Sequence, residues 1–210
     1  MSQVNFTSTS SVSFGELGPT TSLQLMFAKL QLELAETAKT QAMDKMDAIS
    51  QAQDEQKLVS GLLNEARQAQ ADAKAGVGND QEKTQTYELP KKDANGNVMH
   101  DAQGNVVYET VTETVPKGNN ATFMSQEMVD YMDANGLAYD KTANNHSHSA
   151  DEWDVAITSL ESRLEELGTN TQQEMVYIQD YMGQCNSYLQ GANTQISNSN
   201  QTLTSLARGQ

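Results

Sequence analysis

The sequence predicts a mainly α-helical protein in which two long terminal helices form an antiparallel coiled-coil hairpin, with a small α+β head inserted between them. Two stretches, 23–75 and 151–208, contain no proline and place apolar residues at steps of three and four. The stretch between them, 76–150, is instead rich in Gly, Asn, Thr and Val. At about 1.5 Å per residue each helix would be roughly 75–85 Å long, so the two could lie alongside each other.

The composition narrows the class of protein. The chain has 210 residues, 37% of them hydrophobic, and a formal charge of -15. So lean a composition favours an elongated helical chain, a partly disordered one or a subunit completed by partners. The acidic excess argues against binding nucleic acid or an anionic membrane surface. Cys185 is the one cysteine, so no disulfide within the chain is expected, and no apolar run is long enough for direct membrane insertion.

Residues 1–22 are predicted to be a disordered export leader. They are rich in Ser and Thr, contain no Lys or Arg and lack the continuous apolar run of a cleaved signal peptide. We therefore expect any export to follow a route that reads an unfolded N-terminus.

Residues 23–75 are predicted to form the first long helix, with Thr21 or Ser22 as its N-cap. Its apolar seam is Ala35, Ala38, Ala42, Met46, Ile49, Ala52, Val59, Leu63 and Ala66, with polar Gln56 among them. The start of the helix is too densely apolar for one stripe and must be covered on several sides. The residues concerned are Leu23, Leu25, Met26, Phe27, Leu30 and Leu34. They form either the best-packed end of the hairpin or, as we predict, a self-assembly surface.

The head, residues 76–150, should contain a β-hairpin and a short helix. A repeat beginning at Asp93 and again at Asp101 has the composition of turns, and it lacks the Gly and Glu positions of an EF-hand calcium loop. Residues 84–89 and 105–115 alternate as strands. Residues 123–134 suggest a helix capped by Ser125 and ended by Asn135 and Gly136. His146 and His148 could be half of a metal site, but we expect solvated loop histidines, since no further ligand is nearby in sequence.

Residues 151–208 are predicted to form the second long helix. Its seam runs Leu160, Leu164, Leu167, Thr171, Met175, Ile178, Met182, Cys185, Leu189, Ala192, Ile196, Ser199, Leu203 and Leu206. Two successive four-residue steps around Thr171 predict a stutter, and with it a local bend. Residues 181–210 contain no Asp or Glu and only Arg208, so this half is cheap to desolvate against a copy of itself. We predict self-assembly through Ile178, Met182, Leu189, Ile196, Leu203 and Leu206, although an ordinary solvated helix end is the alternative.

Catalysis is not expected, and neither is a cofactor or a metal. The sequence contains no nucleophile elbow, phosphate-binding Gly-rich loop, zinc-spaced Cys/His set or dinucleotide fingerprint. Cys185 lies on the apolar seam with no basic residue near it in sequence, which favours a buried, inert thiol.

The chain resembles the EspA/SseB family of type III secretion filament proteins. Residues 25–28 (LMFA) look like the apolar opening of the first long helix in EspA, and residues 127–137 (EMVDYMDANGL) are similar to a segment of SseB-like proteins. The resemblance covers both helical arms loosely and residues 127–137 more closely, whereas residues 77–122 do not match the family's pattern.

The resemblance implies a secreted subunit that polymerises into a hollow extracellular filament joining the secretion needle to the translocon pore. Its partners would be copies of itself, the needle protein, translocator proteins and a cytoplasmic chaperone that covers residues 23–34 before export. Two alternatives stay open. One is a needle-tip oligomer that gates secretion without elongating, and the other is a cytosolic or phage coiled-coil structural adaptor.

Overall fold

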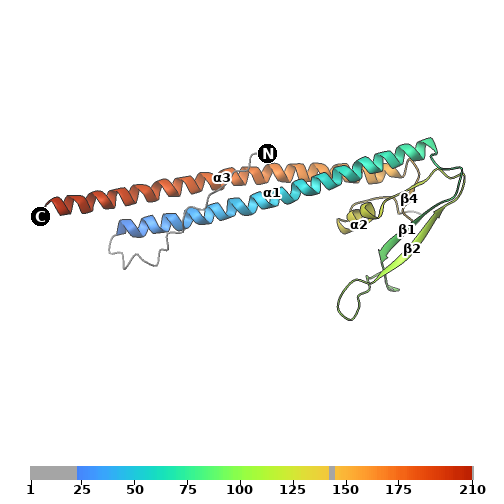
Figure 1. Ribbon diagram of the computed structural model, residues 1–210, viewed down its shortest axis with the longest axis horizontal. Coiled ribbons are helices and arrows are strands. Elements are labelled where there is room, and N and C mark those ends of the chain that lie inside the picture. The colour runs from blue at the N-terminus through green and yellow to red at the C-terminus, as the bar shows by residue number, and fades with distance from the viewer. Residues whose placement is uncertain (1–22, 142–144, 210) are drawn as a thin grey trace. The chain divides into compact units, whose positions relative to one another are not determined.

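The computed structural model describes residues 23–141 and 145–209 (Figure 1). The predicted leader, 1–22, lies outside the described residues. The protein is mainly helical, as predicted, and its two long helices, α1 (Leu23–Ala75) and α3 (Trp153–Arg208), pack against each other. The chain divides into two compact units, and both long helices run through both. Unit 1 comprises Met1–Ala48 and Glu174–Gln210, and unit 2 comprises Ile49–Gln173.

Both long helices follow from local sequence. Neither contains proline, and basic residues that favour a helix C-terminus, Lys74 and Arg208, lie in their last turns. Gly76 follows α1 with a φ of 66°, the left-handed conformation that commonly terminates a helix.

The register of the helical seam in unit 1 differs from the predicted one. Met46 and Met175 were expected to face the partner helix, but both side chains are exposed. Lys45 and Glu174, one residue earlier in each helix, take these places, and their side chains form an ion pair with Nζ and Oε2 2.9 Å apart. Farther along α3 the predicted seam residues Met182, Leu189 and Ile196 are exposed as well, and half-buried Tyr181, Tyr188 and Gln195 take their places. The observed series Thr171, Glu174, Ile178, Tyr181 and Cys185 keeps the steps of three and four unbroken, so the predicted stutter is wrong.

Unit 2 contains the larger apolar core. Its fully buried side chains come from α1, from α3, from the first strand and from the short helix α2 (Gln126–Ala134): Val59, Tyr87, Met128, Met132, Trp153 and Leu160 are representative. Glu55 of α1 ties α2 and α3 to this core, because its Oε1 accepts hydrogen bonds of 2.7 Å from both the Tyr131 hydroxyl and the Arg163 guanidinium.

The predicted β-hairpin is present in unit 2. Strands β1 (Lys83–Pro90) and β2 (Tyr108–Val115) pair antiparallel, with Thr86 opposite Thr112. The repeat forms turns, as predicted: the carboxylates of Asp93 and Asp101 accept backbone N–H bonds from residues two and four positions later. These hydrogen bonds hold the pKa of both carboxyls below their ordinary value.

Helix α2 has the cap and the end that the sequence predicts, but it begins at Gln126 and not at 123, because Phe123 belongs to a short strand. The Ser125 side chain accepts a hydrogen bond from the Met128 backbone N–H, and Asn135 and Gly136 end the helix. Met128, Val129 and Met132 form its buried face. Two short strands, β3 (Thr122–Phe123) and β4 (Ser147–His148), pair beside it in the same unit.

The expectation that His146 and His148 are solvated is wrong. His148 is 1% exposed and His146 is 9% exposed. Each finds partners that are distant in sequence, Glu113 for His146 and Met124 for His148, and these partners make burial of the two rings possible.

Candidate self-assembly surface

The surface of interest is in unit 1, where small side chains fill the contact between α1 and α3. Ala28, Ala35, Ala38 and Ala42 are buried on α1, and Cys185, Ala192 and Ser199 are buried on α3. Ala35, Ala38 and Cys185 form one cluster, against which Tyr188 packs. Cys185 is therefore a buried thiol within the helix contact, as the sequence predicted.

Large apolar side chains lie outside this contact. Ten of the twelve residues predicted to mediate self-assembly are between 36% and 66% exposed: Leu23, Met26, Phe27, Leu30, Leu34, Met182, Leu189, Ile196, Leu203 and Leu206. The remaining two, Leu25 and Ile178, are half-buried. Within unit 1 the small residues contact the partner helix and the large ones face outward.

The exposed residues of α1 form a stripe of their own. Leu23, Phe27, Leu30 and Leu34 follow steps of four, three and four, the spacing of a helix-packing seam. This stripe is displaced round the helix from buried Ala28 and Ala35, so α1 carries two seams, of which α3 covers one. We call these four residues the α1 stripe.

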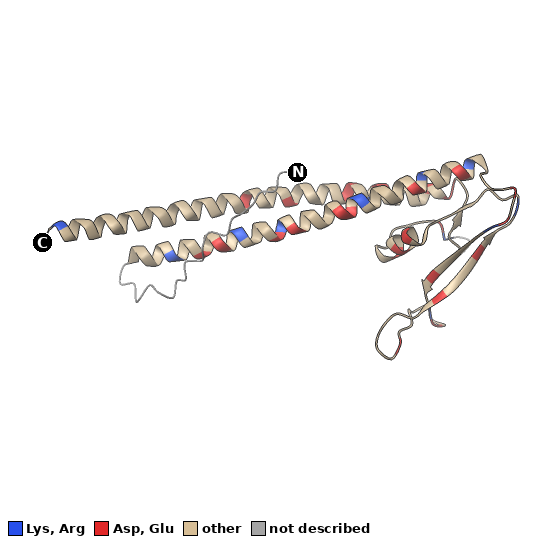
Figure 2. Ribbon diagram, in the orientation of Figure 1, with Lys and Arg blue, Asp and Glu red and all other residues tan. Residues whose placement is uncertain are grey.

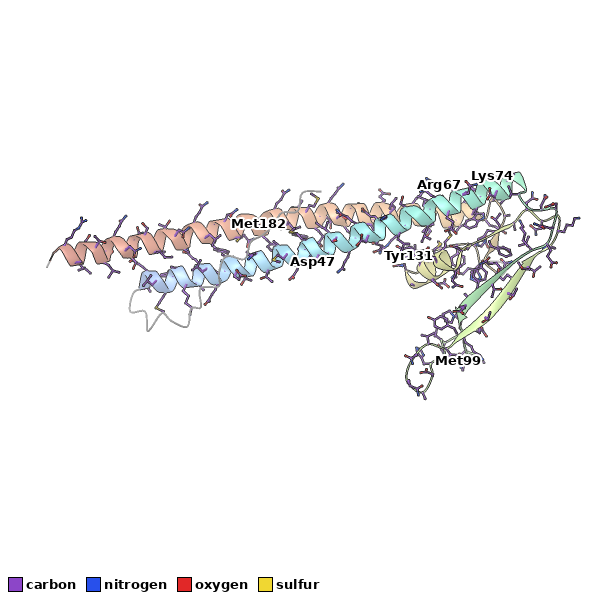
Figure 3. All side chains as sticks on the ribbon, viewed as in Figure 1. Asp47, Arg67, Lys74, Met99, Tyr131 and Met182 are labelled. Atoms are coloured by element: carbon purple, nitrogen blue, oxygen red, sulfur yellow. The ribbon has the colours of Figure 1, made fainter. Side chains whose placement is uncertain are left out.

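The exposed residues of α3 repeat every seven positions. Met175, Met182, Leu189, Ile196 and Leu203 each lie at this spacing, and Figure 3 shows Met182 on the middle part of the helix. We call these five residues the α3 stripe. All five residues were placed in the seam of the predicted hairpin, and Met175 alone was not also predicted to mediate self-assembly. Its place in the seven-residue series, level with exposed Met182, was the signal that could have identified it.

The end of α3 has no cover among the described residues. Every residue from Asn200 to Gly209 is exposed, including Leu203 and Leu206. In unit 1, α3 continues beyond the first residues of α1 (Figure 1). A helix end with exposed leucines and few charges is costly to leave in water.

Charge is nearly absent beside the α3 stripe from Met182 onward, whereas Met175 lies next to Glu174. From Tyr181 to the end of the chain the single charged side chain is Arg208, and Figure 2 shows this part of α3 without red or blue until its last turn. Around the α1 stripe, Lys29 and Glu33 form a weak exposed pair with atoms 3.9 Å apart. The two stripes can therefore be desolvated without stranding many charges.

We also searched the described residues for a metal site and for a membrane-spanning helix. Among residues 23–141 and 145–209, no group of three or more His, Cys, Asp or Glu side chains is arranged to hold a metal ion. A search of the same residues finds no helix long and apolar enough to cross a membrane.

Comparison with known proteins gives no relative from which a role could be transferred. No protein-family model, curated protein or solved structure matches the chain. The candidate site therefore depends on the geometry of unit 1.

Proposed function

We propose that this chain is a structural subunit that assembles with copies of itself through the α1 and α3 stripes of unit 1. The observation that carries the proposal is the sorting of side chains in that unit, where alanines face the partner helix and leucines, methionines and a phenylalanine face outward. Because the outward residues keep helix-packing spacing, the occupant that fits them is another helix.

We further propose that α1 and α3 form a single antiparallel coiled-coil hairpin. Contacts within each unit support this arrangement. In unit 1, Ala35 and Ala38 cluster with Cys185, while Lys45 pairs with Glu174. In unit 2, Glu55 pairs with Arg163, while Arg67 pairs with Glu161. In both units, residues later in α1 contact residues earlier in α3, as they do when two helices run antiparallel.

A second copy is a better occupant than an unrelated partner. The neutral composition of residues 181–210 allows the same surface to meet itself or the α1 stripe without repulsion between like charges. Burying a leucine or phenylalanine side chain stabilises an interface by about 1.5–3 kcal/mol, so several of them together can support assembly even after the cost of association.

In its biological setting, the subunit would form a hollow extracellular filament of a type III secretion system, exported without a cleaved signal peptide. It would join the needle protein to the translocators, and a cytoplasmic chaperone would cover residues 23–34 before export. The role would be one of packing, without catalysis. These assignments depend on the resemblance of residues 25–28 and 127–137 to the EspA/SseB family.

The proposal is tested by comparing Phe27→Asp with Thr40→Asp. Both variants add one carboxylate to an exposed position of α1. With 3.6 residues per turn, Thr40 lies roughly 80–140° round the helix from the residues of the α1 stripe. The expected result is that Phe27→Asp raises the critical concentration for assembly at least about 30-fold, equivalent to ~2 kcal/mol, while Thr40→Asp leaves it unchanged.

Assembly is measured by sedimentation velocity and negative-stain electron microscopy over a range of concentrations. Filaments would support the proposed role, whereas closed rings would favour the needle-tip alternative. Wild-type protein that stays monomeric at high concentration, or a Phe27→Asp variant that assembles as readily as wild type, would show that the α1 stripe is not an assembly surface.

A further inference from the structure

A cluster of aromatic rings and two imidazoles holds residues 145–150 against the rest of unit 2, away from the residues of the proposed assembly surface. We call these residues the strap. Strand β4 of the strap pairs with β3, and the backbone N–H of Met124 donates to the carbonyl of His146 over 2.9 Å. The Trp153 ring lies edge-on to the His148 ring, with centroids 5.3 Å apart.

His146 has a carboxylate partner within the unit. Its Nδ1 lies 2.7 Å from Oε1 of Glu113 on β2, and its backbone N–H donates to Oε2 of the same carboxylate over 2.8 Å. The side chains of both residues are 11% exposed. The imidazole of His146 therefore has a carboxylate at hydrogen-bond distance.

His148 is buried without such a partner. Its Nε2 lies 3.1 Å from Sδ of Met124, and its ring faces the rings of Trp153 and Tyr139. A thioether is a weak hydrogen-bond acceptor and cannot balance a positive charge. The neutral imidazole therefore fits this site, and the imidazolium does not.

The ionisable groups round His148 do not reverse this preference. Burial lowers the pKa of His148 below its ordinary value, and the charge of His146 acts in the same direction. Glu152, Asp140 and Glu113 favour the charged form, but each acts less strongly than burial and the net direction is a lowered pKa. Burial also raises the pKa of Tyr139, so this neighbour stays neutral over the same pH range.

We propose that the strap is an acid-sensitive fastener, which protonation of His148 releases from unit 2 while the long helices stay helical. The direction follows from linkage. Below the free imidazole pKa of about 6.5, a released His148 binds a proton that the docked one does not. Docking is then lost progressively as the pH falls, and the ratio of released to docked strap rises by up to about tenfold for each pH unit.

Trp153 provides the measurement, because it is the only tryptophan in the chain and is fully buried against His148. Acrylamide quenching of Trp153 in the full-length protein is followed from pH 8 to pH 5, together with helical circular dichroism. Quenching reports accessibility, and so separates release of the strap from direct loss of emission beside an imidazolium. We expect accessibility to rise on acidification while the helical signal is retained.

Two histidine variants test whether His148 causes the pH dependence of Trp153 accessibility. His148→Gln keeps a neutral group able to donate to Met124 and should make accessibility independent of pH in this range. His100→Gln changes an exposed histidine beyond the end of β1 and should behave as wild type. Constant accessibility of wild-type Trp153 from pH 8 to pH 5, or a rise in His148→Gln equal to that of wild type, would overturn the proposal.

A titration of wild-type histidine ring protons by NMR covers the case in which His148→Gln fails to fold. We expect one histidine to titrate below the ordinary range, in step with the exposure of Trp153. If instead all three histidines titrate normally while Trp153 stays protected, the proposal is wrong.

Discussion

Side-chain volume separates two kinds of residue along α1 and α3 in unit 1. Ala28, Ala35, Ala192 and Ser199 are buried, while neighbouring leucines and methionines are exposed. Small side chains allow close approach of two helices but bury little apolar area each, so this contact alone provides modest stabilisation. The larger side chains outside it keep most of their apolar surface available for a second contact.

Two glycines of α3 provide a matched test of this close packing. A Cβ at Gly191 would overlap the amide of Gln31 on α1, whereas a Cβ at Gly183 would meet nothing within 4 Å. Replacing a glycine inside a helix by alanine normally stabilises it by about 0.5–1 kcal/mol. We expect Gly183→Ala to show this gain in the free energy of unfolding and Gly191→Ala to show a smaller gain, because the end of the Gln31 side chain must move aside.

The measurement is urea unfolding followed by circular dichroism, in the Phe27→Asp background so that monomers are compared. Adding Gln31→Ala to Gly191→Ala removes the overlapping amide and should recover part of the gain. Equal stabilisation by the two single glycine variants would mean that α3 does not approach α1 closely at Gly191 in solution.

Among the secondary-structure elements, those determined by local chemistry were predictable from sequence. Helix α2 has its cap at Ser125 and its stop at Asn135 and Gly136, and the two hairpin strands follow an alternating pattern with turn residues between them. These features depend on residues within a few positions of one another. Their presence and type could therefore be predicted from the chain alone, although the predicted helix and second strand each began three residues too early.

Features that depend on distant partners were not predictable in the same way. Met46 and Lys45 are adjacent, and periodicity alone could not tell which of them faces the partner helix. Lys45 faces it because its side chain pairs with Glu174, which is distant in sequence. Burial of His146 depends on Glu113, which is 33 residues away in sequence. Ten of the predicted assembly residues are exposed, but the sequence pattern had also placed Met175, Met182 and Leu189 in the hairpin seam, where none of them is buried.

The β-hairpin tip belongs to the elements that should be dispensable for assembly. All residues from 91 to 105 are exposed, and Figure 3 shows Met99 near the tip. Replacing Asp93–Asn105 by a short Gly/Ser turn removes none of the buried core of unit 2.

We expect this replacement to leave both the emission maximum of Trp153 and the critical concentration for assembly unchanged. Emission shows whether unit 2 is intact, and pelleting gives the critical concentration. Assembly lost while Trp153 keeps its wild-type emission would identify the hairpin itself as a contact between subunits.

For the molecule as a whole, charge and apolar surface are divided unequally along the chain. The formal charge is -15, yet residues 181–210 contribute no acidic side chain, and the acids of α3 lie between Asp154 and Asp180. Each subunit added to an assembly would bring this excess close to that of its neighbours. Repulsion therefore opposes an association that apolar contacts favour.

Salt should accordingly strengthen assembly. At physiological ionic strength the Debye length is about 8–10 Å, so added salt screens repulsion between carboxylates while leaving apolar burial in place. Lowering the pH toward the sequence pI of about 4.4 reduces the same repulsion, although it also releases the strap if His148 acts as proposed, so salt at neutral pH is the cleaner variable.

We expect the critical concentration measured by pelleting at pH 7.5 to fall between 20 mM and 300 mM NaCl, and to fall by a similar factor in Thr40→Asp, whose added charge lies outside the stripes. A critical concentration that rises with salt would mean that attractive ion pairs dominate the contact between subunits, which is incompatible with assembly through the uncharged α1 and α3 stripes.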